Sequence, residues 1–227
     1  MIKLSFKPKE VVKKLLTDLP ERSIDVLTKR YGLGKETSKR TLEAIGKEYS
    51  ITRERVRQIE EHGLSLIRKS NQYKELEANF YELGGVIDDL GSLVSEEDLL
   101  DEISKTESVR NSVHFMLVVG ELFTKFREDS HFTHRWATNS NLAKNVEESI
   151  KKLYENLDDE DIISESELIK VFLNNLKDIS EKHKNEEIIR RWLKLSKKIS
   201  QNPLGEWGKT ESPNINVKGI RDYAFLV

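Results

Sequence analysis

Apolar side chains recur at helical spacing through the first third of the chain, and the pattern is densest between residues 41 and 69. A short apolar face over 42–49 breaks at Ser50. Thr52 then offers a side-chain oxygen to the free amides of a longer helix, with Glu54 in its first turn. The apolar side of that helix carries Val56, Ile59, Gly63, Leu64 and Ile67. A short helix, a tight turn and a longer helix predict a helix-turn-helix, whose second helix enters a DNA major groove.

The opposite side of the longer helix is polar and carries Arg53, Glu54, Arg57 and Gln58. Arg can donate two hydrogen bonds to guanine, Gln can pair with adenine at two points, and Glu can accept from the cytosine amino group. These four residues are therefore predicted to read base edges. Thr52 and Arg55 stand at the start of the helix, where contacts to phosphates fix position without reading sequence. On pattern alone, a solvated charged face on a packing helix has about equal weight.

Two further helices are predicted before this motif. Apolar stripes run over 9–19, where Pro20 ends the pattern, and over 23–31, where a Gly-Leu-Gly run ends it. The loop that follows carries three cations: Lys35, Lys39 and Arg40. We predict that they contact phosphates beside the helix-turn-helix, with an ordinary hydrophilic loop as the alternative.

Two stretches carry a family resemblance: LPERSIDVLTKRYGLG, and TLEAIGKEYSITRERVRQIEEHGLSLIRK with its specific core TRERVRQIE. Together they resemble region four, the C-terminal DNA-binding region of bacterial primary sigma factors, over about residues 6–70. The resemblance implies contact with a promoter element upstream of the start site and docking on RNA polymerase. By position, Arg53, Glu54 and Gln58 match the base-reading residues of the family, and Arg55 and Arg57 match residues near the backbone and groove.

In this family, the first half of the region helps form an apolar socket for the flap-tip helix of the polymerase beta subunit. The resemblance makes four apolar residues candidates for that docking: Val12, Leu15, Leu16 and Leu64. Their helical spacing by itself favours a role in the core of the domain.

Charge is divided unevenly along the 227 residues. Residues 1–72 hold 17 Lys and Arg against 10 Asp and Glu, whereas the remainder holds 21 against 30. A basic segment suits phosphate neutralisation, and an acidic one would be repelled by the same duplex. The acidic part is therefore expected to bind protein. The exception is a small basic patch predicted on its first hairpin: Lys125, Arg127, His131 and Arg135.

Behind residue 72 the pattern of three helices followed by a hairpin occurs twice. The first set covers helices at about 73–90, 95–103 and 108–122 with a hairpin at 123–136; the second covers 142–157, a helix capped by Ser164, 186–199 and a hairpin near 203–208. Three helices and a hairpin form a winged-helix layout. Trp136 and Trp207 beside the hairpins are either core residues or exposed anchors for a partner.

The predicted fold class is mostly α: a sigma-region-four-like helix-turn-helix domain followed by two winged-helix-like α+β units with short hairpins. The expected domains are 1–72, 73–138, 139–215 and the start of a further, truncated helical domain at 216–227. The last segment faintly resembles the opening of the helix-turn-helix domain of the RNA polymerase delta subunit.

Several chemistries find no support in the sequence. Cys is absent, which excludes disulfides and thiolate metal sites. His131 and His134 would lie on opposite faces of a strand, and the acidic run 158–161 lacks the Gly and distant Glu of a calcium loop. We expect no catalytic residue, metal, cofactor or small-molecule substrate, and hence no enzyme. No apolar run reaches about 18 residues, so the expected location is the cytoplasm, associated with the nucleoid and not with a membrane.

The function predicted from these patterns is a transcription regulator that binds double-stranded promoter-like DNA and docks on RNA polymerase. Because the chain starts at the region-four resemblance, it is expected to lack the other sigma regions. Two alternatives remain open. One is a polymerase-binding adaptor without sequence-specific DNA contact, and the other is a helix-turn-helix protein of a mobile element or defence system.

Overall fold

The computed structural model describes residues 1–176 and 179–216, which are mostly helical. They form two compact units. The first joins Met1–Val86 to Glu97–Phe123, and the second joins Ile87–Glu96 to the described residues from 124 onward. The domain boundaries expected at 72, 138 and 215 stay predictions, and the segment resembling the delta subunit falls at 217–227, outside the described residues.

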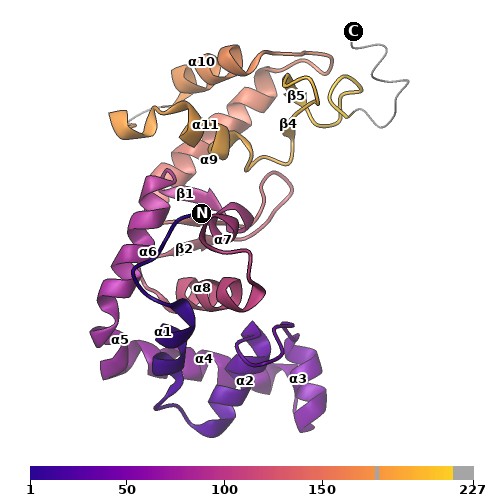
Figure 1. Cartoon of the computed structure of the whole chain (residues 1–227). Helices are drawn as coiled ribbons and strands as arrows, with labels where there is room; N and C mark the ends of the chain where they lie inside the picture. Colours follow the sequence, from indigo (N-terminus) through magenta and orange to yellow (C-terminus); the bar gives the residue numbers. More distant parts are fainter. Residues whose placement is uncertain (177–178, 217–227) are drawn as a thin grey trace. The chain divides into compact units, whose positions relative to one another are not determined.

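The first unit holds the helix-turn-helix (Figure 1). Its helices, with parts of α6 and α7 extending into the second unit, are α1 Pro8–Leu16, α2 Glu21–Tyr31, α3 Leu42–Tyr49, α4 Arg53–Lys69, α5 Asn71–Glu75, α6 Glu77–Asp89, α7 Glu96–Ile103 and α8 Glu107–Val119. The predicted Thr52 cap is confirmed, because its side chain accepts a hydrogen bond from the Arg55 amide at 3.1 Å. Helix α1 ends at Leu16, three residues before the predicted end.

Helix α8 packs against α1, α2 and α4, so it belongs to the same body as the helix-turn-helix (Figure 1). Seven consecutive residues from Asn111 to Leu117 are buried. Arg68 of α4 donates hydrogen bonds to the carbonyl oxygens of Val118 and Val119 at 2.9 and 3.0 Å. Those carbonyls lie in the last turn of α8, where a cation is favourable to the helix dipole.

The second unit contains a three-stranded antiparallel sheet in the order β1-β3-β2 and a separate hairpin. Its elements, besides the shared ends of α6 and α7, are β1 Leu93–Ser95, β2 Thr124–Phe126, β3 Arg135–Ala137, α9 Ser140–Asn156, α10 Glu165–Asn175, a short 3-10 helix Glu181–His183, α11 Glu186–Leu193, β4 Ile199–Gln201 and β5 Trp207–Lys209. Both predicted hairpins are present. Strand β1 and the 3-10 helix were not predicted, and α11 ends six residues early because Ile199 begins β4.

The second unit buries three tryptophans, two of which, Trp192 and Trp207, belong to its apolar core cluster. Trp136, Trp192 and Trp207 are almost fully buried, so Trp136 and Trp207 are core residues and not exposed anchors. The end of the first hairpin also pairs with the segment that follows α11, since the Thr133 amide donates to the Leu195 carbonyl at 3.1 Å. The first predicted hairpin therefore packs in one body with the second predicted set, whereas α8 of the first set packs in the first unit.

The basic patch predicted on the first hairpin is wrong for Arg135, whereas Lys125 and Arg127 are exposed. Arg135 is 2% exposed, and its guanidinium lies 2.6 Å from the Glu147 carboxylate. Lys125 is also paired, with Glu96 at 2.7 Å. Arg135 is thus an internal structural cation, held in addition by the carbonyl oxygens of Arg127 and Thr133.

None of the helices among residues 1–176 and 179–216 is long and apolar enough to cross a bilayer.

Replacing Glu147 by Ala should destabilise the second unit by about 3 kcal/mol, because it leaves a buried guanidinium without its closest carboxylate. The loss should stay at the lower end of the usual range, since Arg135 retains Asp129 and two carbonyl oxygens. Chemical denaturation measures this change. Glu148→Ala removes an exposed neighbouring carboxylate and should alter stability by less than about 0.5 kcal/mol; equal losses in the two variants would contradict the structural role.

Candidate nucleic-acid interface

Helix α4 separates apolar from charged side chains. Val56 and Ile67 are fully buried, whereas the six predicted DNA contacts on this element are all exposed: Thr52, Arg53, Glu54, Arg55, Arg57 and Gln58. The buried side packs on α2 and α3, where Val26 and Ile45 join Val56 in one cluster. Burial of that side leaves the charged side pointing away from the core, as a groove-binding helix requires.

The turn between α3 and α4 is tight. Ser50 takes a left-handed conformation with φ 53°, and the Ile51 amide donates to the Gly46 carbonyl at 2.9 Å. A Cβ at Gly46 would lie 2.7 Å from the Ile51 carbonyl oxygen, so only glycine fits this close approach. Ser50 adopts this left-handed conformation, in which a glycine would be less strained.

The charged side of α4 is internally paired in the free protein. Arg57 lies between Glu54 and Glu61 and donates to Glu54 at 2.6 and 2.9 Å. The hydrogen bond from Arg57 holds the pKa of the Glu54 carboxyl below its usual range, and the same pairing raises the pKa of Arg57. Arg55 donates to the side-chain oxygen of Gln58 at 3.1 Å. To contact bases, Arg57 must therefore leave a carboxylate and Gln58 must release the guanidinium of Arg55.

Arg53 differs from its neighbours. It is the first residue of α4 and is exposed, and its side chain forms no hydrogen bond or ion pair with another described residue. Its charge helps to lower the pKa of the Glu43 and Glu54 carboxyls. Its guanidinium can reach a base edge without first breaking a hydrogen bond or an ion pair.

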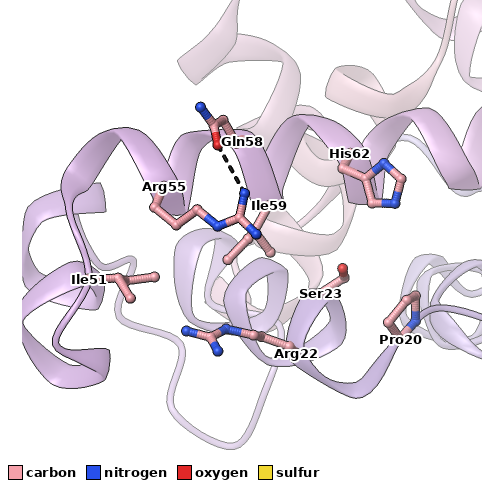
Figure 2. Close-up of a pocket in the computed structure, with 8 residues that line it drawn as sticks. All are labelled: Pro20, Arg22, Ser23, Ile51, Arg55, Gln58, Ile59 and His62. Atoms are coloured by element: carbon pink, nitrogen blue, oxygen red, sulfur yellow. Dashed lines mark hydrogen bonds between the residues drawn. The ribbon is translucent and has the colours of Figure 1, made fainter.

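A pocket opens between the start of α2 and the exposed side of α4 (Figure 2). Its lining is Pro20, Arg22, Ser23, Ile51, Arg55, Gln58, Ile59 and His62. Two guanidiniums and an imidazole border it, and none of these lining residues carries a carboxylate. Arg22 is steadied by the ring of Tyr49, whose centre lies 5.4 Å from its guanidinium carbon. The two guanidiniums at its border can donate hydrogen bonds to an anion.

The sequence reasoning missed Arg22 and His62. His62 lies on a predicted helix and Arg22 directly precedes one, but helical periodicity does not reveal which residue at the start of α2 stands opposite Arg55. The one available signal is a cation two residues after Pro20.

The loop between α2 and α3 holds its three cations differently. Lys35 and Lys39 are exposed, as phosphate contacts would need to be. Arg40 is partly buried and pairs with Glu36 at 3.1 Å and Glu48 at 2.8 Å. Its charge is already compensated within the protein.

The four residues suggested for polymerase docking do not form an open apolar surface. Val12, Leu15 and Leu64 are 4%, 2% and 8% exposed, and Leu16 is partly exposed. Helices α1 and α4, which carry these residues, both pack against α8. Docking through the three buried side chains would require the helices that bury them to separate.

A buried ion also links α2 to α4, which the sequence did not reveal. Glu60 is 9% exposed and accepts a hydrogen bond from the Tyr31 hydroxyl at 2.7 Å, with Arg30 at 3.5 Å. Burial raises the pKa of Tyr31, and the neighbouring Glu60 carboxylate raises it further. This bond ties the end of α2 to the middle of α4.

Comparison with known proteins agrees with this geometry, since the family model described as "Sigma-70, region 4" matches residues 15–69. These residues are a sigma-70 region 4 domain. A domain of this family is a DNA-binding, non-catalytic helix-turn-helix module, and the rest of the chain is unassigned.

The matched relatives are primary sigma factors. RNA polymerase sigma factor RpoD of Helicobacter pylori is 44% identical over 72 residues, which are 32% of this chain and 11% of that protein. RNA polymerase sigma factor SigA of Clostridium acetobutylicum is 44% identical over 68 residues, 30% of this chain and 18% of that protein. The chain thus spans less than a fifth of the length of either relative. No solved structure gives a significant match.

Within the part of the chain that the structure describes, no group of three or more His, Asp or Glu side chains could hold a metal ion.

Replacing Glu61 by Gln should raise the affinity for any duplex by about threefold at low salt, because it removes a negative charge from the DNA-facing side and releases one partner of Arg57. Fluorescence anisotropy with labelled duplexes measures the change, which should shrink as salt is added. Glu10→Gln, on the exposed part of α1, is the matched control and should leave affinity nearly unchanged. Equal or lower affinity in Glu61→Gln would show that this side of α4 does not face DNA.

Proposed function

We propose that the protein is a transcription regulator that reads a promoter-like element in double-stranded DNA with α4. The observation that carries the proposal is the exposure of Arg53, Glu54, Arg57 and Gln58 on one side of the helix of a sigma-70 region 4 domain. The excess of Lys and Arg in residues 1–72 supports the same interface, because it supplies the charge that phosphate contacts need.

Each side chain has a defined role in the proposed readout. Arg53 donates two hydrogen bonds to the acceptor edge of guanine, and Glu54 accepts from a cytosine amino group. An ionised carboxylate can only accept hydrogen bonds, which suits this role. Gln58 gives up Arg55 and pairs with adenine at two points. The Arg57 guanidinium leaves the carboxylate of Glu54 or Glu61 and contacts a base edge in the major groove.

Phosphate contacts position the helix. Thr52 and Arg55 lie at the start of α4, and Arg55 shares its pocket with Arg22. We propose that one phosphate enters this pocket and is held by both guanidiniums. Lys35 and Lys39 extend the contact from the loop before α3, and Arg40 joins them only by exchanging its carboxylate partners.

Docking on RNA polymerase is part of the proposal, supported by the relatives, which are named RNA polymerase sigma factors. With Val12, Leu15 and Leu64 in the core, Leu16 is the candidate docking residue that keeps an accessible side chain. We further propose that the hairpin-bearing, acidic part of the chain is winged-helix-like and binds protein, since its charge disfavours a duplex.

Selection of bound sequences from a random DNA pool, with and without RNA polymerase, tests base reading. The wild type should enrich a defined sequence. Arg53→Ala and Gln58→Ala should each relax one position of it and lose about 1–3 kcal/mol on the selected site. Lys69→Ala, an exposed change at the other end of α4, should keep the preference.

No enriched sequence, combined with polymerase capture that survives Arg53→Ala, would replace the proposal by an adaptor that binds polymerase without reading DNA. An enriched sequence without any polymerase capture would favour DNA binding outside transcription.

Replacing Arg22 by Ala tests the phosphate pocket. The variant should weaken binding to the selected site and to unrelated DNA by the same factor, and the slope of log K against log salt should fall in magnitude by about 1. Arg22→Lys keeps the charge and should retain most of the slope. A changed base preference, or an unchanged slope, would remove Arg22 from the phosphate contacts.

A further inference from the structure

The side chain of Asn111 reaches from α8 to the loop that carries the predicted phosphate contacts. Asn111 is fully buried, and its amide nitrogen donates to the Gly32 carbonyl at 3.1 Å and the Thr37 carbonyl at 2.8 Å. Gly32 and Thr37 belong to the segment 32–41 between α2 and α3. Asn111 itself lies far beyond residues 15–69, which match the sigma family.

Asn111 holds the middle of this segment, and backbone hydrogen bonds to α2 hold its two ends. The Leu33 amide donates to Thr28 and the Arg40 amide to Lys29, both at 3.0 Å. These bonds attach the two ends to α2. Between these two ends, the Thr37 carbonyl accepts from Asn111 at 2.8 Å, so the amide attaches the middle of the segment to α8.

The fit around the Asn111 amide is close. Gly32 has a positive φ of 63°, and a Cβ there would lie 2.2 Å from the Thr37 carbonyl oxygen and 2.7 Å from the Asn111 nitrogen. A glycine, a folded-back loop and a fixed amide therefore occur together at this point. Any other residue at position 32 would push the loop away from α8.

The oxygen of the same amide has no hydrogen-bond partner among the described residues, although it is buried. An apolar side chain of similar size would avoid this unpaired acceptor, but it would leave the carbonyl oxygens of Gly32 and Thr37 without their donor. The two bonds of Asn111 to the loop are what an apolar residue could not supply.

Helix α8 is held in place by contacts to both α4 and α2. Arg68 bonds its last carbonyl groups, and the ring of Phe115 packs edge-on against Tyr31 with 5.1 Å between centres. Tyr31 is the last residue of α2, directly before Gly32. Helix α8 therefore contacts the start of the loop and supports its middle at once.

We propose that Asn111 is a positioning residue for DNA binding, which holds segment 32–41 so that Lys35 and Lys39 face the phosphates beside α4. The proposal rests on the proposed function. It makes α8 a working part of the DNA-binding unit, although the helix lies outside the matched sigma domain. In the segment, Thr37 is half-buried toward Asn111 while Lys35, Ser38 and Lys39 are exposed, which is the arrangement that such a tether produces.

The test uses the full chain with Asn111→Leu, which keeps the size of the side chain and removes its donor. Ser112→Ala is the matched control: Ser112 is the next residue of α8, is 3% exposed, and bonds the Ser108 carbonyl of its own helix at 2.8 Å without touching the loop. Anisotropy at several salt concentrations measures binding to the selected site and to unrelated DNA.

Asn111→Leu should weaken binding to both DNAs by the same factor, roughly three- to tenfold, and should lower the salt slope by up to about 2, the share of two lysine–phosphate contacts. Ser112→Ala should change neither quantity. A purely structural asparagine would shift the melting temperature and leave the slope intact.

The triple variant, Asn111→Leu with Lys35→Ala and Lys39→Ala, tests whether Asn111 acts through the two lysines. If Asn111 acts through these lysines, adding Asn111→Leu to the double variant should lower the slope no further; additive losses would overturn the proposal.

If Asn111→Leu fails to fold by circular dichroism, Asn111→Ser, which keeps one donor, should give an intermediate slope, and a wild-type slope would overturn the proposal. A wild type that binds no DNA refutes the proposed function itself, whereas a wild type and Asn111→Leu with equal slopes refute only the role of Asn111.

Discussion

The burial of the apolar side of α4 is the interaction on which the interface depends. Val56 is removed from water against α2 and α3, and Ile67, three turns further along, is also fully buried. Full burial of such side chains is worth about 1.5–3 kcal/mol each. Because residues on a helix advance by about 100° each, fixing these two positions also fixes the direction of Arg53, Arg57 and Gln58. The polar side need not be stabilised by its own contacts, so it can hold side chains that exchange partners.

The packing of α8 extends this unit beyond the sigma domain. The matched relatives share about 70 residues with the chain, yet the body that contains them here also includes residues 97–123. The added helix lies against α1, α2 and α4 and contributes to a core in which Val12, Leu15 and Leu64 are buried. A shared sequence motif can therefore have a different set of accessible apolar residues when the chain around it differs.

The sequence predicted the helix-turn-helix well because its signals are local. The Thr52 cap, the break at Ser50 and the apolar spacing of α4 each involve residues within one or two turns, and all three were confirmed. The same holds for the Ser164 cap, which accepts from the Glu167 amide at 3.4 Å.

What the sequence could not predict depends on residues that are far apart along the chain. Glu60 is buried by Tyr31, Arg135 by Glu147, and Asn111 by a loop more than seventy positions away. Helical periodicity gives the face on which a residue lies, and not the element that will cover it. For that reason the sequence predicts a surface cation where Arg135 is buried, and it does not reveal that α8 packs against α1, α2 and α4.

The discontinuity of the first unit has a consequence for its synthesis. Helix α8 follows α4 by on the order of 40 residues, so at about 5–20 residues per second it leaves the ribosome several seconds later. During that interval the apolar sides of α1 and α4 lack a covering helix and are open to other apolar surfaces. A chaperone or a neighbouring nascent chain would meet this domain with apolar surface exposed. The domain could complete its packing once residue 119 has emerged.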